Sequence, residues 1–217
     1  MSVALVFRAT DAAANAVNSN SMNWAITAAV VVTWDPALAL GGYTLSNGDR
    51  TTTWANNSNR NARSTISRTG KIYYEGKINT AGNAGTQNPM FGFCNATHNN
   101  NNKAGGDLNS ITADNLCQIS FNGGALGSYS AFVVNDVFML AYDTANGHFW
   151  VGKNGTWLNS GNPAAGTGFV GTGFTGAAAF ACSCVDTIPG APFCVSTANF
   201  KDTEFQFTPP TGFTALG

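Results

Sequence analysis

Charged side chains are scarce in this sequence of 217 residues. They make up 10% of the chain, whereas about 25% is usual for soluble domains. The ten basic and eleven acidic residues nearly cancel and leave a formal net charge of −1. No block of Lys and Arg could neutralise a run of phosphates, so the sequence predicts no nucleic-acid partner. Asn alone contributes 26 residues, so solubility must rest on amides and hydroxyls, which favours a particle surface or an extracellular β-protein.

Long apolar runs are also lacking. The longest, residues 25–32, is far short of the ~20 residues that span a bilayer. The N-terminus has no basic region followed by an apolar segment and a small-residue cleavage site, so we expect no secretory signal peptide. The expectation is therefore no membrane partner and synthesis in the cytoplasm of the producing cell, with release by a route such as lysis if the protein reaches the outside.

Metal-ligating patterns are missing as well. The two histidines are far apart in sequence, and the five cysteines form no CxxC pair. We therefore predict no metal site and no cofactor, and interpret the cysteines as buried thiols in a reduced compartment. The Cys182-Ser183-Cys184 stretch is interpreted as a strand with thiols on both of its faces.

Paired carboxylates for hydrolysis are equally scarce. Glycosidases need two carboxyl groups facing each other roughly 5–10 Å apart, but the only glutamates are Glu75 and Glu204, and the E-x-D-x-x-E pattern common on this jelly roll occurs at neither. No Gly-x-Ser-x-Gly elbow occurs, although a Ser-His-Asp triad of distant members stays open. Asp107 and Asp114 match no calcium-loop spacing. The sequence therefore predicts no catalytic residue and no enzyme.

Strand-forming segments and turns fill the chain from residue 29 onward. Turn signals recur every 8–15 residues, which is typical of a β-sandwich, and no segment has convincing helical periodicity. We predict an N-terminal arm or attachment segment over residues 1–28 and one antiparallel two-sheet β-sandwich over residues 29–217. The expected strands cover residues 30–34, 43–45, 50–54, 71–78, 90–94, 116–121, 129–134, 136–142, 148–151, 177–185 and 193–200.

Two places are candidates for ligand contact. The segment 95–109 has no residues to bury a face, so we expect an exposed loop of the kind that often carries function. Trp157 follows the Asn154-Gly155 turn; its indole either stacks on a sugar or protein partner or folds back over the core, and both alternatives stay open. The candidate ligand-binding residues are His98, Asn99, Asn100, Asn101, Asn102, Lys103, Asp107 and Trp157.

Several short motifs, taken in order, resemble those of the SPRY domain, a concanavalin A-like jelly roll, in the form found in bacteriophage tail and virion proteins. The most specific is Asn135-Asp136 with Asp143, Asn146-Gly147 and Lys153-Asn154-Gly155. The supporting segments are Thr33–Pro36, Thr44–Gly48, Ala62–Thr65, Gly70–Glu75, Thr197–Phe200 and Phe207–Phe213.

The resemblance implies two apposed sheets that recognise a partner through loops at one rim, without catalysis. It implies a bacteriophage virion structural protein, as a tail-fibre receptor-binding module or a capsid decoration. Its partners would be neighbouring virion subunits and a host-surface glycan or protein, in a homo-oligomer or symmetric array.

The sequence departs from the family pattern at Asn135, where glycine is usual, and at Gly76, where a bulkier strand former is usual. Two other functions remain open. One is a free-standing carbohydrate- or protein-binding module, and the other is a polysaccharide-degrading enzyme on the same jelly roll.

Overall fold

The computed structural model describes residues 31–39, 42–54, 60–80, 87–186 and 194–216. Within these ranges the fold is all-β, as predicted, and its only helical turns are the short 3-10 segments Pro36–Leu38 and Asp202–Glu204. No helix among the described residues is long and apolar enough to cross a membrane. The predicted arm, residues 1–28, lies outside the described residues.

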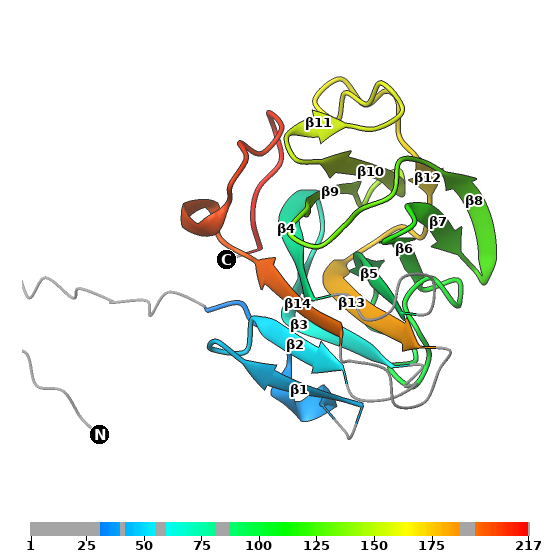
Figure 1. Ribbon diagram of the computed structural model, residues 1–217. Helices are drawn as coiled ribbons and strands as arrows, with labels where there is room; N and C mark the ends of the chain where they lie inside the picture. The colour runs from blue at the N-terminus through cyan, green and yellow to red at the C-terminus, as the bar shows by residue number, and fades with distance from the viewer. Residues whose placement is uncertain (1–30, 40–41, 55–59, 81–86, 187–193, 217) are drawn as a thin grey trace, which may run out of the picture.

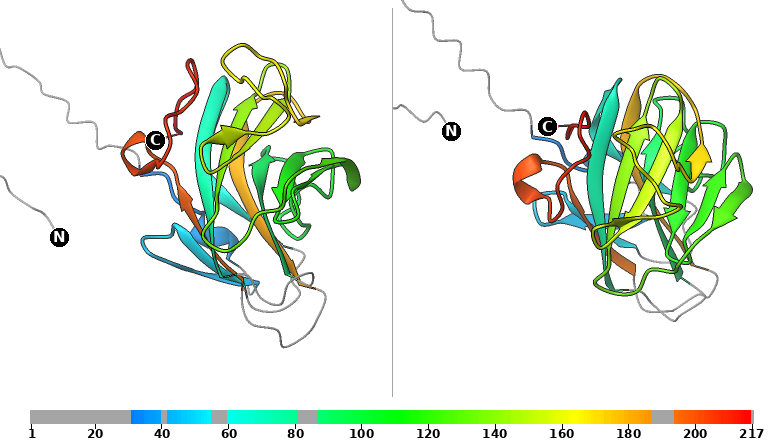
Figure 2. Two further views of the ribbon diagram at one scale, coloured as in Figure 1. Left: turned by 45° about the horizontal axis from the view of Figure 1, so that its top comes forward. Right: turned by 90° about the horizontal axis from the view of Figure 1, so that it is seen from above.

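The strands form two antiparallel sheets that face each other as layers (Figures 1 and 2). In spatial order, the eight-stranded sheet contains β1 (Tyr43–Ser46), β2 (Thr51–Trp54), β14 (Cys194–Asn199), β4 (Lys71–Thr80), β9 (Val137–Asp143), β10 (His148–Lys153) and β11 (Thr156–Trp157), with β12 (Gly171–Thr172) also paired to β10. The six-stranded sheet contains β3 (Asn61–Arg68), β13 (Ala178–Asp186), β5 (Gln87–Cys94), β6 (Ser110–Asp114), β7 (Gln118–Phe121) and β8 (Gly124–Ser128).

The predicted central hairpin is confirmed as β9 and β10. All seven residues of β9 are buried, because its inner face packs on the opposite sheet and its outer face is covered by other side chains. Such double coverage explains why residues 137–142 of this strand are apolar or aromatic on both faces rather than at alternate positions. The turn between the strands closes through the Gly147 amide, which donates to the Asp143 carbonyl at 2.8 Å.

Aromatic rings from the two sheets fill the core between them. The inter-sheet pairs are Phe91 with Phe138, Phe93 with Tyr142, and Tyr74 with Phe180, whose ring centroids are 5.1, 4.9 and 4.0 Å apart. Ring pairs at these separations stabilise beyond their buried area. They also fix the alignment of β5 over β9, because the Phe91 ring meets the early part of β9 and the Phe93 ring meets its later part.

One buried hydroxyl joins the sheets through hydrogen bonds. The Tyr74 side chain on β4 crosses the core, and its oxygen accepts from the Gly92 amide at 2.8 Å. The same hydroxyl lies 2.9 Å from the carbonyl oxygens of Gly92 and Ala181. Burial raises the pKa of Tyr74 well above its usual value, so the proton needed for donation stays in place.

The outer face of the eight-stranded sheet is covered by the chain after β14, which returns along β4 (Figure 1). Buried Glu75 anchors this segment: its carboxylate accepts from the Gln206 and Phe207 amides, both at 2.8 Å. The Tyr73 hydroxyl donates to the same carboxylate at 2.9 Å. Glu75 is therefore a fully engaged structural carboxylate.

Some strand predictions were wrong. In the 30–34 run, the described residues make only a single bridge, between Trp34 and Ser64. The strand after β7 is β8 at 124–128, not 129–134, and β6 was not predicted. Cys182 and Cys184 share the inner face of β13, because residues two apart in a strand point to the same side.

Close packing against Phe91 explains why glycine occupies position 76. The ring of Phe91 lies against its inner face, and a Cβ placed there would be 2.6 Å from two ring carbons. We expect Gly76→Ala to lower the free energy of unfolding by about 1–3 kcal/mol, the usual cost of overpacking a core. Urea denaturation followed by tryptophan fluorescence measures this difference.

Gly124→Ala is the matched control, because a Cβ there would be 3.6 Å from its nearest neighbour, the Phe121 carbonyl. That substitution should leave stability unchanged or slightly higher. Equal denaturation midpoints for the two variants would contradict the packing explanation.

Candidate binding sites

Two pieces of the motif that carries the family resemblance, Asp136 and Lys153-Asn154, assemble into a network at one end of the sandwich. Asp136 is at its centre: its carboxylate is 2.8 Å from the Lys153 ammonium and accepts from the Asn154 side-chain amide at 2.6 Å. It also accepts from the Val133 backbone amide at 2.8 Å. Asn154 completes the ring of contacts, because its side-chain oxygen accepts from the Val137 amide at 2.9 Å.

Burial alone would raise the pKa of the Asp136 carboxyl group. The hydrogen bonds from Lys153, Val133 and Asn154, together with the Lys153 charge, outweigh that effect and hold the pKa below its usual value. Asp136 is therefore charged at neutral pH and holds the network together electrostatically.

The segment between β8 and β9 is fixed on this network. Phe132 stacks on Phe138 with ring centroids 3.6 Å apart, and the Lys153 ammonium lies 5.4 Å from the Phe132 ring centroid. The Phe132 amide donates to the Asn115 carbonyl at 2.6 Å, which attaches the segment to the turn between β6 and β7. Asn135, the departure from glycine, has φ +74°, a conformation that Asn tolerates better than most residues.

Three aliphatic side chains project to solvent from this scaffold. Leu116, Val133 and Val134 are 50%, 63% and 41% exposed, and we call them the aliphatic rim. Leu116 and Val133 each follow one partner of the Phe132–Asn115 hydrogen bond in sequence, so both are carried by the two segments that this bond joins. Exposed aliphatic groups held on one scaffold indicate an interaction surface more strongly than isolated ones do.

The 95–109 segment differs from the predicted exposed loop. Ala104 is fully buried and packs with Cys94, Ala179 and Ala181 on the outer face of the six-stranded sheet. Its amide donates to the Ser183 hydroxyl at 2.9 Å. The segment thus covers part of the outer face of the sheet. Its polar composition gave no sign of this role, because small residues such as Ala104 make the packing contacts.

Its predicted binding residues serve partly to build the loop. His98 is only 3% exposed, and its Nδ1 lies 2.9 Å from both carboxylate oxygens of Asp107. Burial would raise the pKa of Asp107, but hydrogen bonds from His98, the Asn109 amide and Ser110, with the His98 charge, lower it. His98 is therefore placed inside the loop rather than on its surface.

The asparagines divide into two groups. Asn99 accepts from the Asn101 amide at 3.0 Å in a local turn, and both side chains are exposed. The Asn61 backbone amide donates to the Asn100 carbonyl at 3.1 Å, which ties the loop to β3. Asn102 and Lys103 are partly exposed. The loop surface is therefore polar, and its shape is set by internal hydrogen bonds.

Trp157 lies on β11 and is partly buried. It packs in the aromatic cluster on the outer face of the eight-stranded sheet, with its ring centroid 6.3 Å from that of Tyr73. Of the two alternatives, the structure shows the indole folded back against other side chains.

The predicted site residues do not form one site. Phe93, just before the 95–109 loop, stacks on Tyr142 late in β9, whereas Phe91 packs on Phe138 early in β9. The loop is therefore at the end of the sandwich where β9 finishes. Trp157 pairs with Gly152, close to the Lys153↔Phe138 pair at the start of β9, and so lies at the opposite end with the aliphatic rim.

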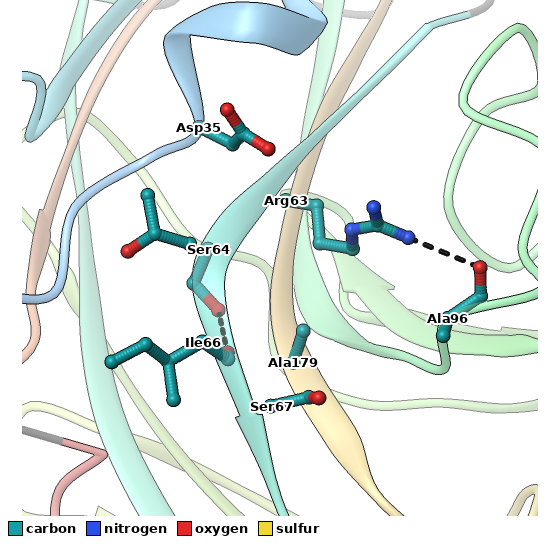
Figure 3. Close-up of a pocket in the computed structure, with 8 residues that line it drawn as sticks. Asp35, Arg63, Ser64, Ile66, Ser67, Ala96 and Ala179 are labelled. Atoms are coloured by element: carbon teal, nitrogen blue, oxygen red, sulfur yellow. Dashed lines mark hydrogen bonds between the residues drawn. The ribbon is translucent and has the colours of Figure 1, made fainter.

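A small pocket lies beside β3 on the six-stranded sheet (Figure 3). The Arg63 guanidinium crosses it and donates to the Ala96 carbonyl at 3.3 Å, and Asp35 lines the other side. Its volume is about 120 Å³, well under the ~300–1,000 Å³ of small-molecule sites. It could take a few solvent molecules but no sugar.

Both glutamates are engaged in structural contacts. Glu75 holds the C-terminal segment, and Glu204 forms an ion pair with Arg50. Among the described residues, no group of three His, Cys, Asp or Glu side chains is arranged to hold a metal ion.

The fold resembles those of known SPRY domains. The SPRY domain of human HERC1 aligns with TM-score 0.52 and 14% identity over 72% of this chain and 91% of that one. The PSpry domain of TRIM65 aligns with TM-score 0.54 and 13% identity over 77% and 88%. No family model and no curated protein matches the sequence. The likeness defines the class of fold: a SPRY-like, concanavalin A-like β-sandwich, as the sequence predicted.

The Asp136 network should make stability depend on pH. Folding lowers the pKa of the Asp136 carboxyl group, so the contribution of this group to stability is complete at neutral pH. That contribution is lost as the pH falls from about 4, the pKa in the unfolded chain, through the lower pKa of the folded protein. We expect Asp136→Asn to cost about 1–3 kcal/mol at pH 7. The difference from the wild type should shrink toward pH 2–3, as measured by urea denaturation across the range.

Asp202→Asn is the control, since that exposed carboxylate belongs to a surface 3-10 turn. It should change stability by less than about 0.5 kcal/mol at either pH. A cost for Asp136→Asn that stayed constant from pH 7 to pH 2 would show that the charge does not hold the network.

Proposed function

We propose that this chain is a non-enzymatic binding module that contacts a protein partner through the aliphatic rim. The observation that carries the proposal is the placement of Leu116, Val133 and Val134 on a hydrogen-bonded scaffold. A surface held in one conformation before binding loses little conformational entropy when a partner docks. The SPRY-like fold supports a binding role by analogy.

The chemistry of the rim favours a protein over a sugar. Sugar-binding surfaces present the flat face of an aromatic ring, whereas the exposed groups here are branched aliphatic side chains. Trp157, the sugar-stacking candidate, is packed against Tyr73. Aliphatic groups beside polar backbone instead fit a polypeptide surface of similar composition.

We further propose that the partner is a neighbouring subunit of a bacteriophage particle, in a tail fibre or as a capsid decoration. The order of the family motifs along the chain and the scarcity of charge support this assignment. Attachment to a host-surface glycan or protein is the alternative use of the same module, and the polar 95–109 loop at the far end is the surface available for it.

Two substitutions separate these surfaces. Val133 and Leu108 are 63% and 59% exposed, so an aspartate at either position should leave folding intact. If the rim is the docking surface, Val133→Asp should weaken capture of the labelled protein by gradient-purified phage particles at least tenfold, and Leu108→Asp should not. Binding is measured by co-sedimentation, with thermal melts confirming that each variant is folded.

The opposite pattern, with Leu108→Asp defective and Val133→Asp normal, would move the site to the 95–109 loop. A bacterial-glycan array, with release of reducing ends assayed in parallel, tests the remaining alternatives. Glycan binding without particle capture would make the chain a free-standing lectin-like module, and release of reducing ends would overturn the non-enzymatic assignment.

A further inference from the structure

Three thiols meet in the core at the same end of the sandwich as the aliphatic rim. Cys182 and Cys184 point inward from β13 in the six-stranded sheet, and Cys194 points inward from β14 in the eight-stranded sheet. Each is at most 2% exposed. Among the described residues no cysteine forms a disulfide.

One pair among the three faces across the core, although its members belong to different sheets and stand ten positions apart in the chain. The Thr52 hydroxyl lies 3.9 Å from the Cys182 sulfur, and Thr52 pairs with Ser196 in the eight-stranded sheet. Cys184 and Cys194 each lie two residues further toward the same end of the sandwich, so they are placed opposite each other. Two thiols that face each other across the core are the arrangement from which a disulfide forms.

The chemical environment distinguishes the thiols. The hydrogen bond from Cys184 is the main factor that lowers the pKa of Cys194, and a contact with the Ser196 hydroxyl at 3.7 Å contributes. Burial raises the pKa of Cys182. Since the thiolate is the reactive form, Cys194 is the nucleophile of the group.

We propose that Cys184 and Cys194 form a reversible disulfide that joins the two sheets when the protein meets a disulfide oxidant such as oxidised glutathione. The Cys194 thiolate attacks one glutathione sulfur, forming a mixed disulfide and releasing one glutathione thiolate. The Cys184 thiolate then attacks the Cys194 sulfur of that mixed disulfide and releases the second. The protein loses two protons and two electrons, and oxidised glutathione is reduced to two thiols.

The bond would link the end of β13 to the start of β14, which lie at the same end of the sandwich. It requires the two sulfur atoms to approach to ~2.05 Å. A cross-link between the sheets restricts the unfolded chain, so the oxidised protein should melt at a higher temperature than the reduced protein. A reductant should reverse the change.

The test uses the full chain, oxidised by oxidised glutathione in two ways: in the folded state and during refolding from urea, where burial cannot block access. The expected result in both is a mass loss of about 2 Da, from the two hydrogens removed by disulfide formation. Cleavage before Asp186 separates Cys184 from Cys194, so non-reducing peptide mapping with fragmentation identifies the pair.

Cys184→Ala and Cys194→Ala should each abolish the mass loss and the rise in melting temperature. Cys117→Ala, which removes a buried thiol in the turn between β6 and β7 outside this pair, is the matched control and should retain both. If an alanine variant fails to fold, the peptide map of the wild-type protein decides alone. A Cys182–Cys194 linkage, a stable glutathione adduct or five unmodified thiols after refolding would each overturn the proposal.

Discussion

The hydroxyl of Tyr74 is the contact on which the arrangement of the two sheets depends. A phenol buried between two sheets must find hydrogen-bond partners, because an unpaired polar group in the core is costly. Its partners are the Gly92 amide and the carbonyls of Gly92 and Ala181, all in the opposite sheet. The side chain therefore fixes β4 over the β5–β13 pair at one position. From there the ring pairs Phe93–Tyr142 and Phe91–Phe138 set how β9 runs, and the start of β9 places the Asp136 network.

What the sequence predicted well depends on short-range signals. The Asn47-Gly48 turn and the Asn146-Gly147 turn join strands that pair as expected, because both need backbone conformations that Asn and Gly adopt readily. The ordered family motifs identified the SPRY-like fold, although each motif alone is short. They also marked the scaffold of the rim, since Asp136 and Asn154 come together in space. The exposed side chains that the scaffold carries were not singled out, because nothing in Val133 or Leu116 distinguishes them from core residues before the fold is known.

What the sequence did not predict depends on contacts between distant segments. The 95–109 loop appeared unable to bury a face, yet Ala104 covers Cys94 and Ala181. The burial of His98 beside Asp107 likewise follows from how the loop folds, not from either residue type. Trp157 was ambiguous because its environment is supplied by Tyr73, more than eighty positions earlier in the chain. In each case a residue was assigned from its neighbours in sequence, whereas its neighbours in space determined its role.

The aliphatic rim and the thiol contact share one end of the sandwich but act on different strands. The rim rests on β9, β10 and the turn after β6, and its conformation is held by Asp136, Lys153 and Phe132. The two facing thiols belong to β13 and β14, one in each sheet. A covalent bond there would stabilise the association of the sheets without changing a side chain that faces the proposed partner. Stability and recognition can then be adjusted separately, because the residues that hold the sheets together at this end are not the residues that meet solvent on the rim.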